Sequence, residues 1–323
     1  MPAQLAEEWL QFEATIGARP LPPGNTVAEI RANSAKLAAG PPPDQNSSPA
    51  LNIRDDVVGD RSVPIRTYIP KQGVDMLPVG IFMRMSPCSY FQTRSLTCYE
   101  TAEAALARHI AESVPMVVVS VDYKLAPEHK WPASLHDCVD VAKWAQSKFA
   151  ELGADVSRGL ILTGVSSGAQ LSISTAAQLL SESVPVRGVA PFVPLTLSPA
   201  AVTQELKASG KYKSYDENGD GPLVSPKLLE VFLEALGADA NDASFSVLFN
   251  ANLNKFPPTY VVTCGADILR DDGRLLVEEL KKKGVTVKHD EYPGYPHVFW
   301  MIPGLKILER FYPNVTAGFR AIL

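Results

Sequence analysis

The sequence predicts an α/β protein with a mainly parallel sheet of eight strands, helices on both faces and a helical cap. From residue 51 onward, strand-like apolar runs alternate with helical patterns, which is typical of a parallel sheet covered on both sides. Only a short Gly-Asp-Arg-Ser turn joins the first two strands, which should therefore pair as an antiparallel hairpin at one edge. Between Leu195 and Phe256 the alternation stops, and Pro-rich turns and a polar stretch replace it. This break predicts an insertion.

Eight apolar runs have the length and composition of strands. They lie at 51–58, 63–69, 77–83, 116–122, 159–164, 188–195, 259–265 and 285–292. Between them, apolar residues recur with helical spacing at roughly 95–113, 133–151, 167–183, 272–284 and 303–321, and a further helix is expected inside the break at 226–237.

The chain has 323 residues, which suggests about two folding units, although one α/β domain with insertions also reaches this size. We expect residues 51–195 and 255–323 to form one core. Residues 1–50 read as a helical arm, rich in Pro, Gly and Ala from residue 19 onward. This arm and an insertion at 196–254 are the segments expected to cap one end of the sheet.

The composition limits which class of binding partner and which cellular compartment we expect. The net charge of −5 and the absence of any basic block argue against nucleic acid and favour a small molecule. The N-terminus lacks a signal-peptide pattern, the apolar runs are too short to span a membrane, and the four cysteines form no CxxC pair, so we expect a cytoplasmic protein. No metal or nucleotide motif is present, so no cofactor is expected. A homodimer is compatible with the sequence.

The strongest local motif is Gly164-Val165-Ser166-Ser167-Gly168, between an apolar strand and a helical pattern. A sharp strand-to-helix turn would project Ser166 from the carboxyl end of the strand, with small residues on both sides allowing close backbone approach. The N–H of Ser167, at the start of the helix, could then stabilise an oxyanion. The alternative is a tight turn in which a serine only caps the helix.

A serine nucleophile needs a base and an orienting carboxylate, which on such a sheet follow in the order acid, then histidine. His289 falls inside the last predicted strand, whereas His297 follows that strand in a loop, so His297 is the preferred base. Asp267 ends the strand at 259–265 and is the preferred acid. Asp271 and Asp272 come a helical turn later and are expected to cap the helix near residue 273.

These motifs resemble the hormone-sensitive-lipase-like branch of the α/β-hydrolase fold. The segment 121–133, with Asp-Tyr-Lys-Leu-Ala-Pro-Glu-His, is similar to that branch's Asp-Tyr-Arg-Leu-Ala-Pro-Glu-His. The resemblance, which runs from about residue 25 to the C-terminus, places Ser166, Asp267 and His297 on the family's nucleophile, acid and base. The patterns at 213–218 and 257–267 look most like fungal members that resemble versiconal hemiacetal acetate esterases, which are tailoring enzymes of secondary metabolism.

One departure from this branch concerns the oxyanion hole. The family's His-Gly-Gly-Gly is replaced by Arg84-Met85-Ser86-Pro87, in which Pro87 has no N–H to donate. Backbone donors are therefore expected from Ser167, Met85 and Ser86. Losing one such donor typically costs on the order of 10² to 10³ in rate.

Three functions stay open on the sequence. The first is a carboxylesterase or lactonase acting on a small acyl ester or secondary metabolite. The second is a non-hydrolytic enzyme that uses the same triad for elimination, cyclisation, carbon–carbon cleavage or acyl transfer on a polyketide-like product, and the third is a non-catalytic binder. The expected pocket, between the sheet's carboxyl edge and the cap, would be lined by Met83, Arg84, Tyr90, Phe91 and Trp300.

Overall fold

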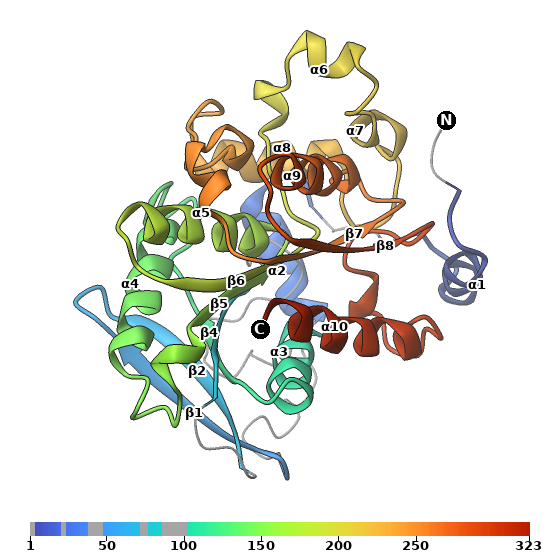
Figure 1. The fold of residues 1–323 in the computed structure, drawn as a ribbon. Coiled ribbons are helices and arrows are strands. Elements are labelled where there is room, and N and C mark those ends of the chain that lie inside the picture. The colour runs from blue at the N-terminus through green and yellow to red at the C-terminus, as the bar shows by residue number, and fades with distance from the viewer. Residues whose placement is uncertain (1–3, 21–23, 38–47, 72–76, 86–101) are drawn as a thin grey trace.

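An eight-stranded sheet in the order β1-β2-β4-β3-β5-β6-β7-β8 forms the centre of the molecule (Figure 1). The computed structural model describes residues 4–20, 24–37, 48–71, 77–85 and 102–323. The strands are β1 (Leu51–Val58), β2 (Val63–Pro70), β3 (Val79–Met83), β4 (Val117–Val121), β5 (Leu160–Val165), β6 (Val186–Phe192), β7 (Thr259–Cys264) and β8 (Val287–Tyr292). All eight predicted strands are present.

The pairing of the strands follows the prediction. β1 and β2 form an antiparallel hairpin at one edge, and β2 also runs antiparallel to β4. Every other pair, from β4 and β3 across to β7 and β8, is parallel. The carboxyl ends of these parallel strands therefore meet along one edge, where loops from β5, β7 and β8 can converge.

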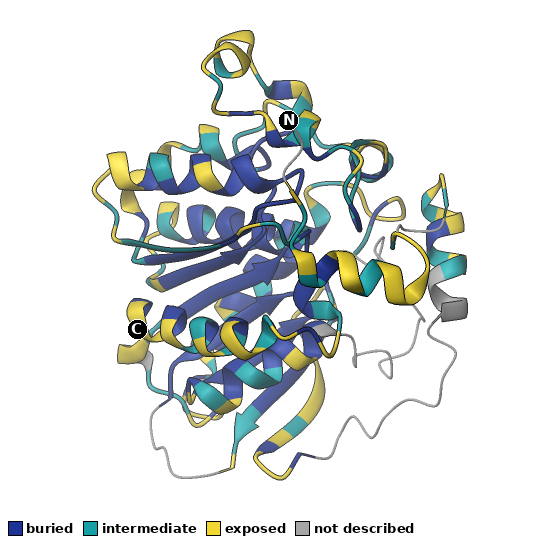
Figure 2. Ribbon diagram, turned by 90° about the vertical axis from the view of Figure 1, so that its right-hand side faces the viewer, coloured by how far each residue is buried: buried dark blue, intermediate teal, exposed yellow. Residues whose placement is uncertain are grey.

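Helices cover both faces of the sheet. One face carries α4 (Ala133–Ser147), α5 (Ser167–Ser181) and α9 (Arg270–Lys282), and the other carries α3 (Ala102–Ser113) and α10 (Leu308–Ile322) (Figure 1). Alternation along the strands builds the two cores: Val119 packs into one and its neighbour Val118 into the other. Figure 2 shows the central strands buried between helices whose outer sides are exposed, whereas the edge strand β1 is largely exposed.

Two helices begin where the sequence did not place them. α9 begins at Arg270, so Asp271 and Asp272 lie inside its first turn. α10 begins at Leu308, and not near 303, because Pro303 and Gly304 form a turn. The predicted helix at 95–113 is described from Ala102 onward, and residues 95–101 lie outside the described residues.

The remaining helices lie outside the sheet and its two helical layers. The N-terminal region contains α1 (Glu7–Ile16) and α2 (Val27–Leu37), and the chain between β6 and β7 contains α6 (Gln204–Ala208), α7 (Ser214–Glu217) and α8 (Pro226–Leu236). Short 3-10 helices are η2 (Val156–Arg158), η3 (Pro199–Ala201), η4 (Val247–Phe249), η5 (Ala251–Lys255) and η6 (Phe299–Met301).

Backbone contacts join the N-terminal arm to the segment between β6 and β7. Leu223 N–H donates to the carbonyl of Pro20, and the guanidinium of Arg19 donates to the carbonyl of Asp220. α8 begins after Ser225, whose side chain accepts the N–H of Leu228 as an N-cap. Over the described part of the chain, no helix combines the length and apolar character needed to cross a bilayer.

Candidate active site

Ser166 occupies a strained turn between β5 and α5. Its φ of 57° and ψ of −114° are uncommon for a residue with a side chain. A Cβ added at Gly164 would lie 2.3 Å from the carbonyl oxygen of Gly168, and one added at Gly168 would lie 1.9 Å from that of Met83. The turn therefore requires glycine on both sides of the serine, which is the reason the sequence motif has this form.

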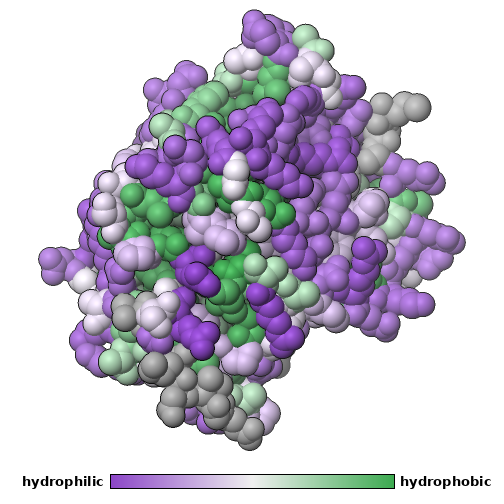
Figure 3. Space-filling view, in the orientation of Figure 1, coloured by the Kyte–Doolittle hydropathy of each residue, from purple (hydrophilic) through white to green (hydrophobic). Residues whose placement is uncertain are grey.

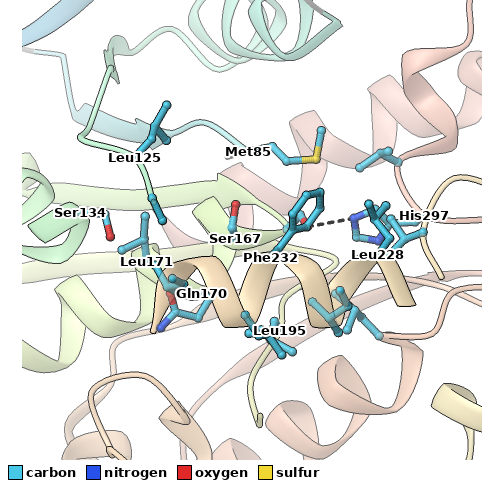
Figure 4. Close-up of a pocket in the computed structure, with 18 of the residues that line it drawn as sticks. Met85, Leu125, Ser134, Ser167, Gln170, Leu171, Leu195, Leu228, Phe232 and His297 are labelled. Carbon is cyan, nitrogen blue, oxygen red and sulfur yellow. Dashed lines mark hydrogen bonds between the residues drawn. The ribbon is translucent and has the colours of Figure 1, made fainter. Parts of the chain in front are cut away.

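The structure brings Ser166, His297 and Asp267 together. Nε2 of His297 lies 2.9 Å from Oγ of Ser166, although 131 positions separate them in the chain (dashed line at His297 in Figure 4). Nδ1 of the same ring lies 2.7 Å from Oδ2 of Asp267. The three side chains follow the ends of β5, β8 and β7, so the parallel sheet explains how they converge.

The imidazole and the carboxylate are both shielded from solvent. Their residues are 1% and 2% exposed, and Oδ1 of Asp267 also accepts the N–H of Leu269 at 3.0 Å. This second bond fixes the carboxylate, and the carboxylate fixes the ring with Nδ1–H toward Asp267. Nε2 is then left as an acceptor facing the serine hydroxyl, the arrangement needed for general-base catalysis.

The other candidate base lies elsewhere. His289 is in β8, and its Nε2 lies 2.8 Å from Oγ1 of Thr263 in the neighbouring strand. Burial lowers the pKa of His289, so the ring favours its neutral form. It is a sheet-face residue, as its alternating position in the strand predicts.

The carboxylates of Asp271 and Asp272 do not cap α9, contrary to the expectation. Oδ2 of Asp271 accepts the N–H groups of Lys213 and Ser214 at 2.8 Å each. Oδ1 of Asp272 accepts those of Thr196 and Leu197 at 2.9 and 3.0 Å. Both carboxylates thus hold the chain between β6 and β7 against α9, and neither reaches the site of Ser166.

The three backbone N–H groups expected to donate to an oxyanion are placed differently relative to that expectation. Met85 N–H donates to the carboxylate of Glu103, so the expectation that it points at a substrate oxygen is wrong. Ser86 lies outside the described residues. Ser167 directly follows Ser166 and is the first residue of α5. Backbone N–H groups in the first turn of a helix have no acceptor within that helix.

Glu103 is an unusual neighbour for this site. Its side chain is in α3, and the residue is only 8% exposed. Burial raises its pKa to about 7, while the bond from Met85 and the positive charge of Arg84 act in the opposite direction. No sequence motif indicates a role for Glu103, because an isolated glutamate near the start of a helix is normally exposed to solvent.

Arg84 is held by two residues that directly follow β4. Its guanidinium pairs with the carboxylate of Asp122, and its carbonyl accepts the hydroxyl of Tyr123 at 2.8 Å. It does not contribute to the cavity beside Ser166, which corrects its assignment to the substrate pocket. Tyr123 does line that cavity, and burial raises the pKa of its hydroxyl.

A mostly apolar cavity of about 330 Å³ lies beside Ser166 and His297 (Figure 4). One side is formed by α8, whose cavity-facing residues are apolar. They are Leu228, Leu229, Phe232, Leu233 and Leu236. Met85, Leu125, Leu171 and Leu195 add further apolar surface. A ligand with few polar atoms fits such a lining.

Other residues expected in the pocket lie away from it. Met83 packs in the core on the α4 and α5 face, and Trp300 stacks on Phe311 with ring centroids 4.8 Å apart. Neither lines this cavity, because each is turned into the packed interior. Tyr90 and Phe91 lie outside the described residues. The apolar face of α8, the helix predicted at 226–237 inside the expected cap, lines the cavity.

Figure 3 shows a largely hydrophilic surface, coloured purple, on which apolar side chains, coloured green, are exposed in several places. Within the described ranges, no group of three or more His, Cys, Asp or Glu side chains is placed to hold a metal ion.

The chain resembles known esterases along its whole length. It is 33% identical to the versiconal hemiacetal acetate esterase of Dothistroma septosporum, with 100% of this chain and 96% of that protein covered. The crystal structure of a hyperthermophilic esterase from the archaeon Pyrobaculum calidifontis matches with a TM-score of 0.79 at 25% identity and covers all of both chains. Vibralactone cyclase matches with a TM-score of 0.84 at 26% identity, covering 99% of this chain and 95% of that one.

A family model described as "alpha/beta hydrolase fold" matches residues 95–301. These residues include the strained serine turn, the acid-bearing loop after β7 and the histidine-bearing loop after β8. With a predicted and observed eight-stranded sheet and esterase relatives at both the sequence and the structure level, the chain belongs to the α/β hydrolase family.

Proposed function

We propose that the chain is a serine-dependent carboxylic ester hydrolase in which Ser166, His297 and Asp267 form the catalytic triad. The observation that carries the proposal is the continuous pair of hydrogen-bond contacts from Oγ of Ser166 through the imidazole to Oδ2 of Asp267. A serine hydroxyl is a weak nucleophile, and this arrangement gives it an adjacent base of fixed orientation.

The reaction begins when Oγ of Ser166 attacks the ester carbonyl and Nε2 of His297 takes the hydroxyl proton. The imidazolium that forms is stabilised by Asp267 and returns the proton to the leaving alcohol. The acyl group then remains on Ser166. A water molecule, deprotonated by His297, attacks this acyl-enzyme and releases the carboxylic acid, which restores the serine.

Negative charge develops on the carbonyl oxygen during this attack. We assign its stabilisation to the N–H of Ser167 and the N-terminal end of α5. Met85 N–H is engaged by Glu103 and supplies nothing to that oxygen in this arrangement. We therefore expect a slower esterase than one with a complete set of backbone donors.

The N-terminal arm at 1–50 and the insertion at 196–254 would serve as the cap over the site. Pro20 of the arm and α8 of the insertion both line the cavity, and the Leu223 to Pro20 hydrogen bond joins the two. A substrate would place its apolar part between this cap and the carboxyl edge of the sheet, with its carbonyl at Ser166.

The substrate class follows from the lining and from the relatives. The apolar cavity favours a small acyl ester or lactone with an apolar or ring-containing body, and a versiconal hemiacetal acetate esterase among the relatives supports an ester of a secondary metabolite.

The test is hydrolysis of 4-nitrophenyl acetate and butyrate by the wild type, Ser166→Ala and His297→Ala, each checked for folding by circular dichroism. We expect turnover by the wild type and a loss of at least 10³-fold in both variants. Equal rates in the wild type and in Ser166→Ala would contradict the proposal. Activity on a polyketide-like ester that survives Ser166→Ala but not His297→Ala would identify acid–base chemistry without an acyl-enzyme.

A further inference from the structure

Two polar side chains in the apolar cavity have no role in the triad. Gln170 is in α5, one helical turn after the nucleophile, and Ser134 is in the first turn of α4. Their residues are 3% and 6% exposed, and both line the cavity. Figure 4 shows them on the same side of Ser167, with His297 on the other side.

The amide of Gln170 has only one possible orientation. Its Nε2 donates to the carbonyl of Phe245 at 3.0 Å and to Oγ of Ser174 at 2.9 Å. Oγ of Ser174 spends its own hydrogen on the carbonyl of Ser244, so it must accept from Gln170. Because carbonyl oxygens cannot donate, the NH₂ group points at these partners, and Oε1 points away from them.

Among the described residues, no hydrogen bond joins Oε1 of Gln170 or Oγ of Ser134 to another protein atom, and neither atom is one of the fully enclosed unpartnered ones, so both open onto the cavity. A polar atom that opens onto an apolar cavity can bond to a ligand that enters, and a ligand that offers no partner there gives up the bond that water would make. Their position on the cavity wall points to a ligand as the missing partner. An amide oxygen accepts only, while a hydroxyl both accepts and donates.

We propose that Gln170 and Ser134 are specificity residues that recognise a hydroxyl group on the substrate arm lying in the cavity, away from the reacting carbonyl. The substrate hydroxyl donates to Oε1 of Gln170, and a second oxygen of the substrate arm or the same hydroxyl accepts from Ser134. The preferred substrates are therefore esters whose apolar body ends in an alcohol or a phenol. This inference rests on the proposed esterase function.

The position of Gln170 makes the recognition specific. The side chain is fixed by the insertion at residues 244 and 245 and lies within one turn of Ser166, so little freedom is lost when a ligand binds. A site built to bond a substrate hydroxyl also discriminates against the analogue that lacks it, because the analogue leaves the protein group unpaired.

The experiment compares pairs of 4-nitrophenyl esters that differ only by a terminal hydroxyl. The pairs are 6-hydroxyhexanoate and hexanoate, 8-hydroxyoctanoate and octanoate, and 3-(4-hydroxyphenyl)propanoate and 3-phenylpropanoate. For each pair, the ratio of kcat/KM for the hydroxylated and the plain ester is measured in the wild type, Ser134→Ala and Gln170→Met. Leu228→Met, an apolar change in the same cavity, is the matched control.

We expect the wild type to prefer the hydroxylated member of at least one pair, and both polar variants to reduce that preference by roughly 3- to 10-fold. Leu228→Met should keep the preference even where it changes both rates. Because Ser134→Ala removes one oxygen atom and no packing, it tests the proposal even if Gln170→Met folds poorly.

Ratios at or below one for every pair in the wild type, or ratios that neither polar variant changes, would overturn the specificity proposal while leaving the esterase proposal intact. Absence of turnover on every plain and hydroxylated ester would instead count against the esterase function on which it rests. The two failures are therefore distinguishable.

Discussion

Gly168 packs against Met83 so closely that a Cβ at position 168 would lie 1.9 Å from the carbonyl oxygen of Met83. The contact joins the start of α5 to the end of β3, and it sets where the strained serine turn sits against the chain that leads to Met85. Both atoms in conflict would belong to backbone or Cβ, so neither can rotate away.

Replacing Gly168 by alanine adds only one methyl group. Because that group has no space, the replacement should still displace the residues around Ser166. We expect Gly168→Ala to displace the turn at Ser166, to reduce kcat on 4-nitrophenyl butyrate by at least 10²-fold, and to lower the free energy of unfolding by about 1 to 3 kcal/mol. Ala169→Gly, at the next position of the helix, is the matched control and should reduce activity far less. A fully active Gly168→Ala variant would show that the close approach is not required.

The proposed role of Asp267 as the carboxylate that orients His297 predicts a specific loss of activity. In Asp267→Asn the amide oxygen can keep the Leu269 N–H bond, which turns the NH₂ group toward His297 and forces the ring to place its proton on Nε2. The imidazole can then no longer accept the serine proton, and we expect kcat to fall on the order of 10⁴-fold.

Asp271→Asn is the control for Asp267→Asn. Asp271 lies four residues further along, in α9, and its carboxylate accepts the backbone N–H groups of Lys213 and Ser214. Its kcat should stay within a few-fold of the wild type. Steady-state kinetics at one pH above 7 measures both, and similar losses in the two variants would exclude Asp267 as the orienting carboxylate.

Glu103 predicts a pH dependence of stability. Burial raises the pKa of its carboxyl to about 7 in the folded protein, above the ordinary value near 4.5. The folded state therefore binds the proton more tightly than the unfolded state. The stability this contributes is present in full below about pH 4.5 and is lost as the pH rises through about 7.

Glu103→Gln removes this titration and keeps an oxygen that can accept the N–H of Met85. Relative to the variant, the wild type should lose about 1 to 3 kcal/mol of unfolding free energy between pH 4.5 and pH 8. Urea denaturation of both proteins at four pH values measures the difference. A difference that stays constant across this range would mean that Glu103 does not titrate with a raised pKa.

The N-terminal arm predicts a coupling between the first residues and the catalytic loop. Ala6 N–H donates to the carbonyl of Gly294 at 2.8 Å, and Glu8 accepts the hydroxyl of Tyr295 at 2.7 Å, two residues before His297. Trp9 is fully buried. Loss of the arm would expose this surface and loosen the turn that leads to the base.

We expect removal of residues 1–18 to lower kcat by about 10-fold and to make the chain after Tyr292 more accessible to protease. Leu10→Ser, at an exposed position of α1, should have no such effect. Unchanged kinetics and an unchanged protease pattern after truncation would show that the arm does not support the His297 loop.

Much of the fold and of the candidate site could be predicted from the sequence because both rest on local patterns. β5 and β7 are continuous apolar runs, and the glycines flanking Ser166 report a sharp turn through their lack of a Cβ. His297 could be separated from His289 because His289 falls inside the last predicted strand and His297 in the loop that follows it. The resemblance to a known family added the order in which these pieces occur.

The parts that could not be predicted depend on contacts between distant segments. The engagement of Met85 N–H by Glu103 links residues 18 positions apart through tertiary packing and leaves no local pattern. Trp300 reads as an aromatic pocket residue beside the base, but stacking on Phe311 turns it into the core. The orientation of Gln170 follows from carbonyls of residues 244 and 245, far along the chain.

The most direct test of the triad is covalent labelling with a serine-directed fluorophosphonate, read by intact mass and by mapping of the modified peptide. We expect one phosphonyl group per chain, located on Ser166, with labelling at least 10²-fold slower in His297→Ala, which lacks the base. Labelling at another residue, or equal labelling rates in the wild type and His297→Ala, would contradict it.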